Sequence, residues 1–237
     1  MKFKSSDEAY LTRRKALSDA TGPRELWSVI DHWPLYCGVG NLARFLAIYE
    51  LLKGTVAVPG HVAEFGSWRG ANLMFMAKVL RILDPHGPKV VHAFDSFQGL
   101  AEFADKDGGA LAMRDHYRGD QDELSTLIDL YDAHHDVVIH PGIIEHTLPA
   151  LLAAEPHLSF SFVYCDTDLY TSTHVILEQL DPRLSVGGVF VLDEWNHELY
   201  PGEGVAANEF MAVHGDRYEV RAVPMARQPT LVLQKRR

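Results

Sequence analysis

The 237-residue sequence has only two cysteines, no apolar run long enough to cross a membrane, and no excess of basic residues. Cys37 and Cys165 lie far apart, which argues against a disulfide scaffold or a cysteine zinc site and favours a reducing, cytoplasmic compartment. Without a run of about 18 apolar residues we expect no transmembrane helix, and the N-terminus lacks the apolar core of a secretory signal. The formal net charge of −10 repels nucleic-acid backbones, so we expect no nucleic acid as a partner. Since no apolar span is present, we expect no membrane as a partner either.

Short β-like runs alternate with longer helical runs. Strands are predicted at 61–66, 90–96, 136–140, 160–166, 187–194, 218–224 and 230–235, and helices at 72–83, 123–135, 146–155, 171–184 and 204–215. Helices of about 10–15 residues between strands indicate an α/β fold, with a mostly parallel seven-stranded sheet covered by helices on both faces. The last two strands form a hairpin, and a hydroxyl residue caps the helix at 171–184.

The first 55 residues, which include a helical pattern at 41–54, precede the sheet. We expect residues 1–55 to be a helical extension and residues 56–237 to be the domain that contains the sheet. The extension would cover a sheet edge, form a lid over the site, or make a contact between subunits.

Acidic residues stand at the ends of several predicted strands, where ligands bind in sheets of this kind. They are Asp95, Asp166, Asp168, Asp193 and Glu194. Repulsion among them would cost stability unless a positive group is bound. Three all-oxygen ligands, Asp166, Asp193 and Glu194, suit a hard cation such as Mg²⁺, Ca²⁺ or Mn²⁺. The alternative is that single acids cap the helices that follow.

A glycine-rich turn, GSWRGAN (66–72), joins the first strand to its helix. Trp68 stands where the dinucleotide fingerprint G-x-G-x-x-G needs its second glycine, so an NAD-dependent oxidoreductase is disfavoured. Asp95, at the end of the next strand, can accept both hydroxyls of a ribose. A glycine turn with a ribose acid but no pyrophosphate site indicates a nucleoside-type cofactor such as S-adenosylmethionine.

Six strings occur in the order of a known family: VPGHVAEFGSWRGANL (58–73), AFDSFQGL (93–100), PGIIEHTLP (141–149), YCDTDLYTST (164–173), LSVGGVFVLDEW (184–195) and PGEGVAANEF (201–210). Over roughly residues 40–215 the chain resembles the macrocin O-methyltransferase family of class I S-adenosylmethionine-dependent methyltransferases. It looks most similar to the branch that includes the calicheamicin-pathway rhamnosyl O-methyltransferase. The resemblance implies a Rossmann-like class I fold and methylation of a sugar hydroxyl in antibiotic or other natural-product biosynthesis.

The resemblance also implies roles for individual residues. The residues that would hold the cofactor are Glu64, Gly66, Ser67, Trp68, Arg69, Gly70, Asn72, Asp95, Ser96, Phe97 and Asp166. Asp166, Asp193 and Glu194 match the Mg²⁺ ligands, although many members have Asp-Asp in place of Asp193-Glu194. Asp168 matches the general base, and Trp195 and His197 would line the acceptor pocket.

A sugar hydroxyl is a poor nucleophile near neutral pH and needs a base or a metal. We therefore expect one strand-end acid to hold the metal and Asp168 to accept the proton. The partner would be a glycoside or sugar nucleotide, and the resemblance suggests a homo-oligomer. Three alternatives remain: a Mg²⁺-dependent catechol-type methyltransferase, an NAD-dependent oxidoreductase, and a non-catalytic cofactor-binding module.

Overall fold

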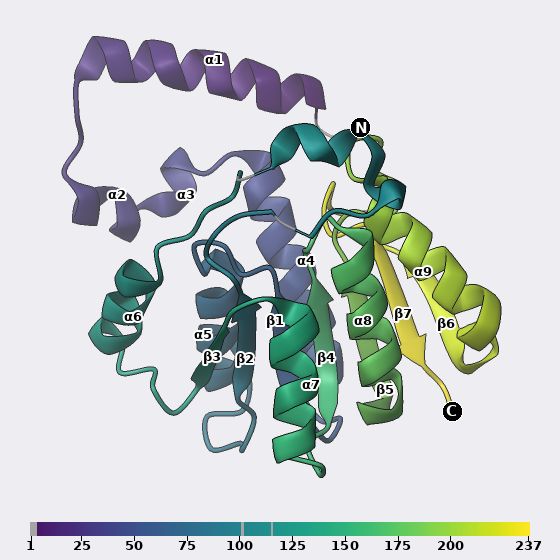
Figure 1. Cartoon of the computed structure of the whole chain (residues 1–237). Coiled ribbons are helices and arrows are strands. Elements are labelled where there is room, and N and C mark those ends of the chain that lie inside the picture. The colour runs from purple at the N-terminus through teal and green to yellow at the C-terminus, as the bar shows by residue number, and fades with distance from the viewer. Residues whose placement is uncertain (1–3, 101, 115) are drawn as a thin grey trace.

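A central sheet of seven strands organises the chain (Figure 1), and the computed structural model describes residues 4–100, 102–114 and 116–237. The strands are β1 (His61–Phe65), β2 (Val91–Asp95), β3 (Val137–Pro141), β4 (Phe160–Cys165), β5 (Leu184–Leu192), β6 (Tyr218–Ala222) and β7 (Leu231–Lys235). Their order is β3-β2-β1-β4-β5-β7-β6, and β7 runs antiparallel to both of its neighbours. The predicted α/β fold and C-terminal hairpin are confirmed.

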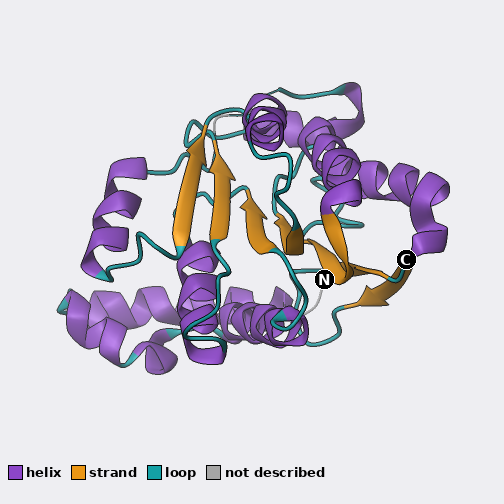
Figure 2. Ribbon diagram, turned by 90° about the horizontal axis from the view of Figure 1, so that it is seen from below, coloured by secondary structure: helices purple, strands orange, loops and turns teal. Residues whose placement is uncertain are grey.

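Helices cover both faces of the sheet, which gives three layers (Figure 2). One face is covered by α4 (Val39–Thr55), α5 (Ala71–Leu83) and α6 (Gln121–Leu130), and the other by α7 (Ile144–Ala154), α8 (Tyr170–Leu180) and α9 (Pro201–His214). The sequence of α5 explains why this helix packs against the sheet. Its buried residues Leu73, Met76, Ala77 and Leu80 are spaced so that they lie on one face of the helix. The strand β4 is buried along its whole length, as expected for a strand between two helical layers.

The predicted extension contains α1 (Lys4–Thr21), α2 (Leu26–Asp31), α3 (Trp33–Tyr36) and α4, and its residues 1–3 lie outside the described residues. In Figure 1, α1 stands apart from the sheet and its flanking helices. The helix α4 differs because Ile48 and Leu52 are buried in the core against the sheet. Among the described residues, no helix has the length and apolar character needed to span a membrane.

Several local predictions need correction. The predicted helix at 123–135 ends at Leu130, and a 3-10 segment, η1 (Asp105–Met113), was not anticipated. Two shorter 3-10 turns are η2 (Asp181–Arg183) and η3 (Gly215–Arg217). No hydroxyl caps α8, since its N-cap is Leu169. Instead Asp107 of η1 accepts a hydrogen bond from the Tyr170 amide at 2.7 Å, so a distant carboxylate supplies the cap that the local sequence was expected to provide.

Three histidines lie side by side across β1, β2 and β3. Nδ1 of His92 is 3.0 Å from Nε2 of His140, with the two rings stacked, and His61 meets His92 edge-on. Burial, and then the neighbouring His140 and His61, lower the pKa of His92 from 6.5 to about 4. The folded protein therefore keeps His92 neutral at a pH where the unfolded chain protonates it.

We expect acid to destabilise the fold through His92. Between pH about 6.5 and 4 the unfolded chain binds the extra proton, so stability falls as pH falls, by up to about 3 kcal/mol. Replacing His92 with phenylalanine should reduce this loss, measured as the difference in unfolding free energy between pH 7.5 and pH 5 by urea denaturation. The exposed His135 provides the matched control, His135→Phe. Equal pH dependence in wild type and His92→Phe would contradict the assignment.

Candidate active site

A cavity of about 290 Å³ opens beyond the carboxyl ends of the parallel strands. Its wall includes the first glycine turn, the ends of β2, β4 and β5, and one residue of α4. The lining residues used below are Arg44, Gly66, Trp68, Asp95, Ser96, Glu102, Tyr117, Asp166, Asp168, Asp193, Glu194 and Gln228. The glycine turn and all five predicted strand-end acids therefore line one cavity, as the parallel topology predicts.

Gly66 is required where β1 leaves the sheet. Its φ is +86°, a conformation that side-chain-bearing residues rarely adopt. A Cβ atom there would lie 1.8 Å from the carbonyl oxygen of Asp166. The end of β1 and the start of the acidic loop after β4 are thus packed backbone against backbone.

Asp95 ties the glycine turn to the end of β2. Its Oδ2 accepts the amide of Trp68 and its Oδ1 accepts the amide of Phe97, each at 2.6 Å. Burial raises the pKa of Asp95, and the two amide hydrogen bonds oppose that shift. Each carboxylate oxygen keeps a second lone pair for a ligand in the cavity.

Glu64 lies under the glycine turn and is 1% exposed. Burial raises its pKa to about 7, while the neighbouring Ser67 and the charge of Arg44 oppose that shift. Its Oε2 is buried without a hydrogen-bond partner. An orphaned carboxylate oxygen of this kind suits a ligand that brings its own donor.

The structure separates the predicted cofactor residues into two groups. Gly66, Trp68, Asp95, Ser96 and Asp166 line the cavity, whereas the described lining does not include Glu64, Ser67, Arg69, Gly70, Asn72 or Phe97. The guanidinium of Arg69 lies 5.1 Å from the centre of the Trp68 ring. Phe97 is buried in the core cluster that packs against β1 and β2, so its side chain supports the fold of the turn.

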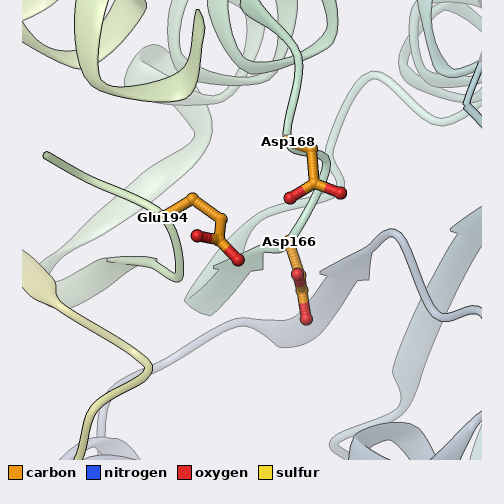
Figure 3. Close-up of side chains that lie close together, drawn as sticks. All are labelled: Asp166, Asp168 and Glu194. Atoms are coloured by element: carbon orange, nitrogen blue, oxygen red, sulfur yellow. The ribbon is translucent and has the colours of Figure 1, made fainter. Parts of the chain in front are cut away.

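Three carboxylates gather after β4 and β5 (Figure 3): Asp166, Asp168 and Glu194. One oxygen from each lies within 4.8 Å of the others. Asp168 has a φ of +63°, an unusual conformation for a residue with a side chain. The Glu194 amide donates to Oε1 of Glu203 at 2.6 Å, which fixes the backbone at the end of β5.

Asp193 lies beside this group but makes different contacts. Its Oδ1 is 2.7 Å from Nη2 of Arg44 and accepts a hydrogen bond from the Tyr164 hydroxyl. The trio that the structure brings together therefore contains Asp168, where the sequence-based ligand set has Asp193. Asp168 is therefore the predicted base and also a member of the carboxylate cluster.

Burial is the largest influence on the charges of the cluster. It raises the pKa of Asp168 to about 7 and of Glu194 to about 8, and the charge of Asp193 adds to both shifts. Burial and Asp193 also raise the pKa of Asp166 well above its ordinary value. Such a site has a strong tendency to take up positive charge, either as protons or as a cation.

The donor set fits a hard divalent cation. All the clustered ligand atoms are carboxylate oxygens, the type that Mg²⁺ prefers. In addition, Oδ2 of Asp193 and Oε2 of Glu194 are buried without hydrogen-bond partners. These orphaned oxygens provide an observation independent of the clustering.

The two predicted substrate residues lie at the edge of the site. Trp195 donates through Nε1 to Asn208 at 3.1 Å and packs against the core cluster under α9. Nδ1 of His197 is 3.6 Å from Oε2 of Glu194, and its ring stacks on Tyr200. Among the described residues, neither belongs to the lining of the cavity.

Sequence reasoning missed Arg44, Tyr117, Tyr200 and Gln228. Tyr117 and Tyr200 share a hydroxyl–hydroxyl hydrogen bond of 2.8 Å, and Gln228 donates to Oε1 of Glu194. Arg44 alone had a usable signal, because it is the single charge in the apolar stretch NLARFLAIY (41–49). Tyr117, Tyr200 and Gln228 lie in segments whose sequence contains no motif that would predict a role in the site.

Comparison with known proteins identifies related sequences. The family described as macrocin-O-methyltransferase (TylF) matches residues 37–224. The 8-demethyl-8-(2,3-dimethoxy-alpha-L-rhamnosyl)-tetracenomycin-C 4'-O-methyltransferase of Streptomyces olivaceus is 35% identical over 58% of this chain and 54% of its own length. The demethyldecarbamoylnovobiocin O-methyltransferase of Streptomyces niveus is 33% identical over 75% of this chain and 70% of its own. The chain thus spans about half of the first relative and more of the second.

Solved structures share the fold. CalS11, a calicheamicin methyltransferase, superimposes with a TM-score of 0.83 at 24% identity, covering 97% of this chain and 92% of that one. The O-methyltransferase NovP gives a TM-score of 0.71 at 27% identity, covering 83% and 81%. The likeness to CalS11 extends over nearly the whole chain, including the helices before the sheet.

Proposed function

Since this chain belongs to the macrocin-O-methyltransferase family, we propose that it transfers a methyl group from S-adenosylmethionine to a sugar hydroxyl of a glycosylated natural product. The observation that carries the proposal is that one cavity is lined by the glycine turn, by Asp95 and by the carboxylates of Asp166, Asp168 and Glu194. The names of the relatives support it, because the Streptomyces olivaceus protein is named for 4'-O-methylation of a rhamnosyl-tetracenomycin and the Streptomyces niveus protein is named an O-methyltransferase of demethyldecarbamoylnovobiocin.

The cofactor end of the cavity would be formed by the turn and Asp95. The free lone pairs of Asp95 would accept the ribose hydroxyls. Glu64, with its orphaned Oε2, is our candidate acceptor for the ammonium group of the methionine part. Trp68, 42% exposed and edge-on to Tyr117, would supply an aromatic wall.

The acceptor end would be formed by the carboxylates. Asp166, Asp168 and Glu194 would hold a divalent cation, which when bound lowers the pKa of a hydroxyl and orients it. Asp168 would accept the proton of the acceptor hydroxyl, since a carboxylate positioned beside that hydroxyl can act as a general base. One of its oxygens belongs to the cluster, which leaves the other for the proton.

The helices before the sheet would serve as a contact between subunits. Apolar side chains are exposed along them, among them Trp27 at 50%, Leu35 at 78% and Val39 at 58%. Exposed apolar patches of this kind mark interaction sites. Light scattering of the full chain should give a mass above the 26.6 kDa of one protomer, and a monomer would contradict this proposal.

An acceptor screen tests the proposed reaction. Purified protein with S-adenosylmethionine and Mg²⁺ would be offered rhamnosylated antibiotics that lack one methyl group, and catechols as a parallel set. We expect a mass gain of one methyl group on the sugar of a glycoside and none on a catechol. Methylation of catechols alone would assign the protein to the catechol-type reaction.

A further inference from the structure

Arg44 reaches the cavity from α4, a helix that precedes the sheet in the sequence. Its Nη2 lies 2.6 Å from Oδ2 of Asp166 and 2.7 Å from Oδ1 of Asp193. The Tyr164 hydroxyl is a further neighbour at 3.4 Å. One guanidinium nitrogen thus bridges the acids that end two adjacent strands.

The strand-end acids serve two sites for positive charge: the salt bridge to Arg44 and the carboxylate cluster proposed to hold a cation. Asp166 belongs both to the arginine bridge and to the carboxylate cluster, whereas Asp193 belongs to the bridge. The side chain of Asp193 is 1% exposed, so its charge depends on Arg44 for compensation. Its other oxygen remains without a partner.

A cation in the cluster would share Asp166 with the guanidinium. Like charges at such short range repel, and within a partly buried site water screens that repulsion weakly. The arginine therefore opposes the arrival of a second positive charge. It also occupies Oδ1 of Asp193, which leaves only the buried Oδ2 of that side chain without a partner.

We propose that Arg44 is a positioning residue that competes with a divalent cation for the strand-end carboxylates, keeping Asp193 out of the ligand set and limiting the affinity of the cluster for metal. This inference rests on the cation site of the proposed function. Through Arg44, the helix α4 would set the affinity of the carboxylate cluster for a metal ion.

A titration with Mn²⁺ alone, followed by the loss of the free-ion electron paramagnetic resonance signal, tests the proposal. We expect Arg44→Gln to bind Mn²⁺ about tenfold more tightly than wild type, because a unit positive charge beside the site is gone. Arg81→Gln is the matched control, since Arg81 pairs with Asp136 and is not part of the cavity lining. The control should leave the Mn²⁺ affinity unchanged.

Asp193→Asn supplies an independent arm if Arg44→Gln does not fold. Glu194→Gln should weaken Mn²⁺ binding at least about tenfold because it removes a ligand. Asp193→Asn removes a neighbouring negative charge but no ligand of the cluster, so it should weaken Mn²⁺ binding clearly less than Glu194→Gln does. Equal losses in these two variants, or weaker or unchanged Mn²⁺ binding in folded Arg44→Gln, would overturn the proposal.

The Mn²⁺ titration and the methyl-transfer assay test the Arg44 proposal and the proposed reaction separately. Methyl transfer by wild type in excess Mg²⁺ and in EDTA tests the reaction and its metal dependence. If wild type does not bind Mn²⁺ but Arg44→Gln does, the arginine masks the site and the proposal stands. If neither binds, competition by Arg44 is excluded, whatever the turnover measurement shows.

Discussion

Replacing Asp168 with asparagine is expected to lower kcat/KM for methyl transfer by at least about 100-fold, the low end of what a positioned general base contributes. Asparagine keeps the shape of the side chain but cannot accept the proton of the acceptor hydroxyl. Asp95 and the glycine turn are unaffected, so the affinity for S-adenosylmethionine should stay within about threefold of wild type. The measurements are steady-state kinetics at saturating Mg²⁺ and calorimetric titration of the cofactor.

Glu102→Gln is the matched control for this experiment. Glu102 also lines the cavity but is exposed and is not part of the carboxylate cluster. Its replacement should leave kcat/KM within about threefold. Near wild-type turnover of Asp168→Asn would show that another group takes the proton.

Gly66→Ala should destabilise the protein by at least about 3 kcal/mol and abolish cofactor binding. The positive φ of +86° costs alanine about 1–2 kcal/mol. The added Cβ, 1.8 Å from the Asp166 carbonyl oxygen, must also push apart the end of β1 and the loop that carries the acids. Urea denaturation gives the free energy of unfolding, and calorimetry gives the cofactor affinity.

Gly54→Ala is the matched control, because it makes the same glycine-to-alanine replacement at a position where the added Cβ has room. Gly54 lies within α4, and a Cβ there would meet no atom within 4 Å. Because alanine favours a helix over glycine, this variant should be as stable as wild type or up to about 1 kcal/mol more stable. A Gly66→Ala protein with wild-type stability and cofactor affinity would show that the turn does not shape the site.

The main architecture was predictable because its causes are local. Alternation of short apolar runs with amphipathic helices predicted the succession of strands and helices along the chain and the helices on both faces of the sheet. Parallel strands then placed Asp95, Asp166, Asp168 and Glu194 at one edge, as found in the cavity. The strained turn at Gly66 was also visible from sequence, since glycine is the residue for such backbone.

The remaining features depend on contacts between distant residues. Arg44 and Asp166 are 122 positions apart, and no local pattern predicts that this side chain compensates the strand-end acids. The orientation of Asp193 toward Arg44 and Tyr164 follows from that contact. Likewise the cap of α8 comes from Asp107, 63 positions before Tyr170, so the hydroxyls beside the helix could not reveal it.

Calorimetric titration of S-adenosylmethionine into the purified protein, with and without Mg²⁺ and with NAD(H) as the control ligand, tests the central claim most directly. We predict saturable one-to-one binding of S-adenosylmethionine, which Asp95→Ala weakens, and no binding of NAD(H). Failure to bind S-adenosylmethionine, or preference for NAD(H), would contradict the assignment of the cavity as the site of methyl transfer.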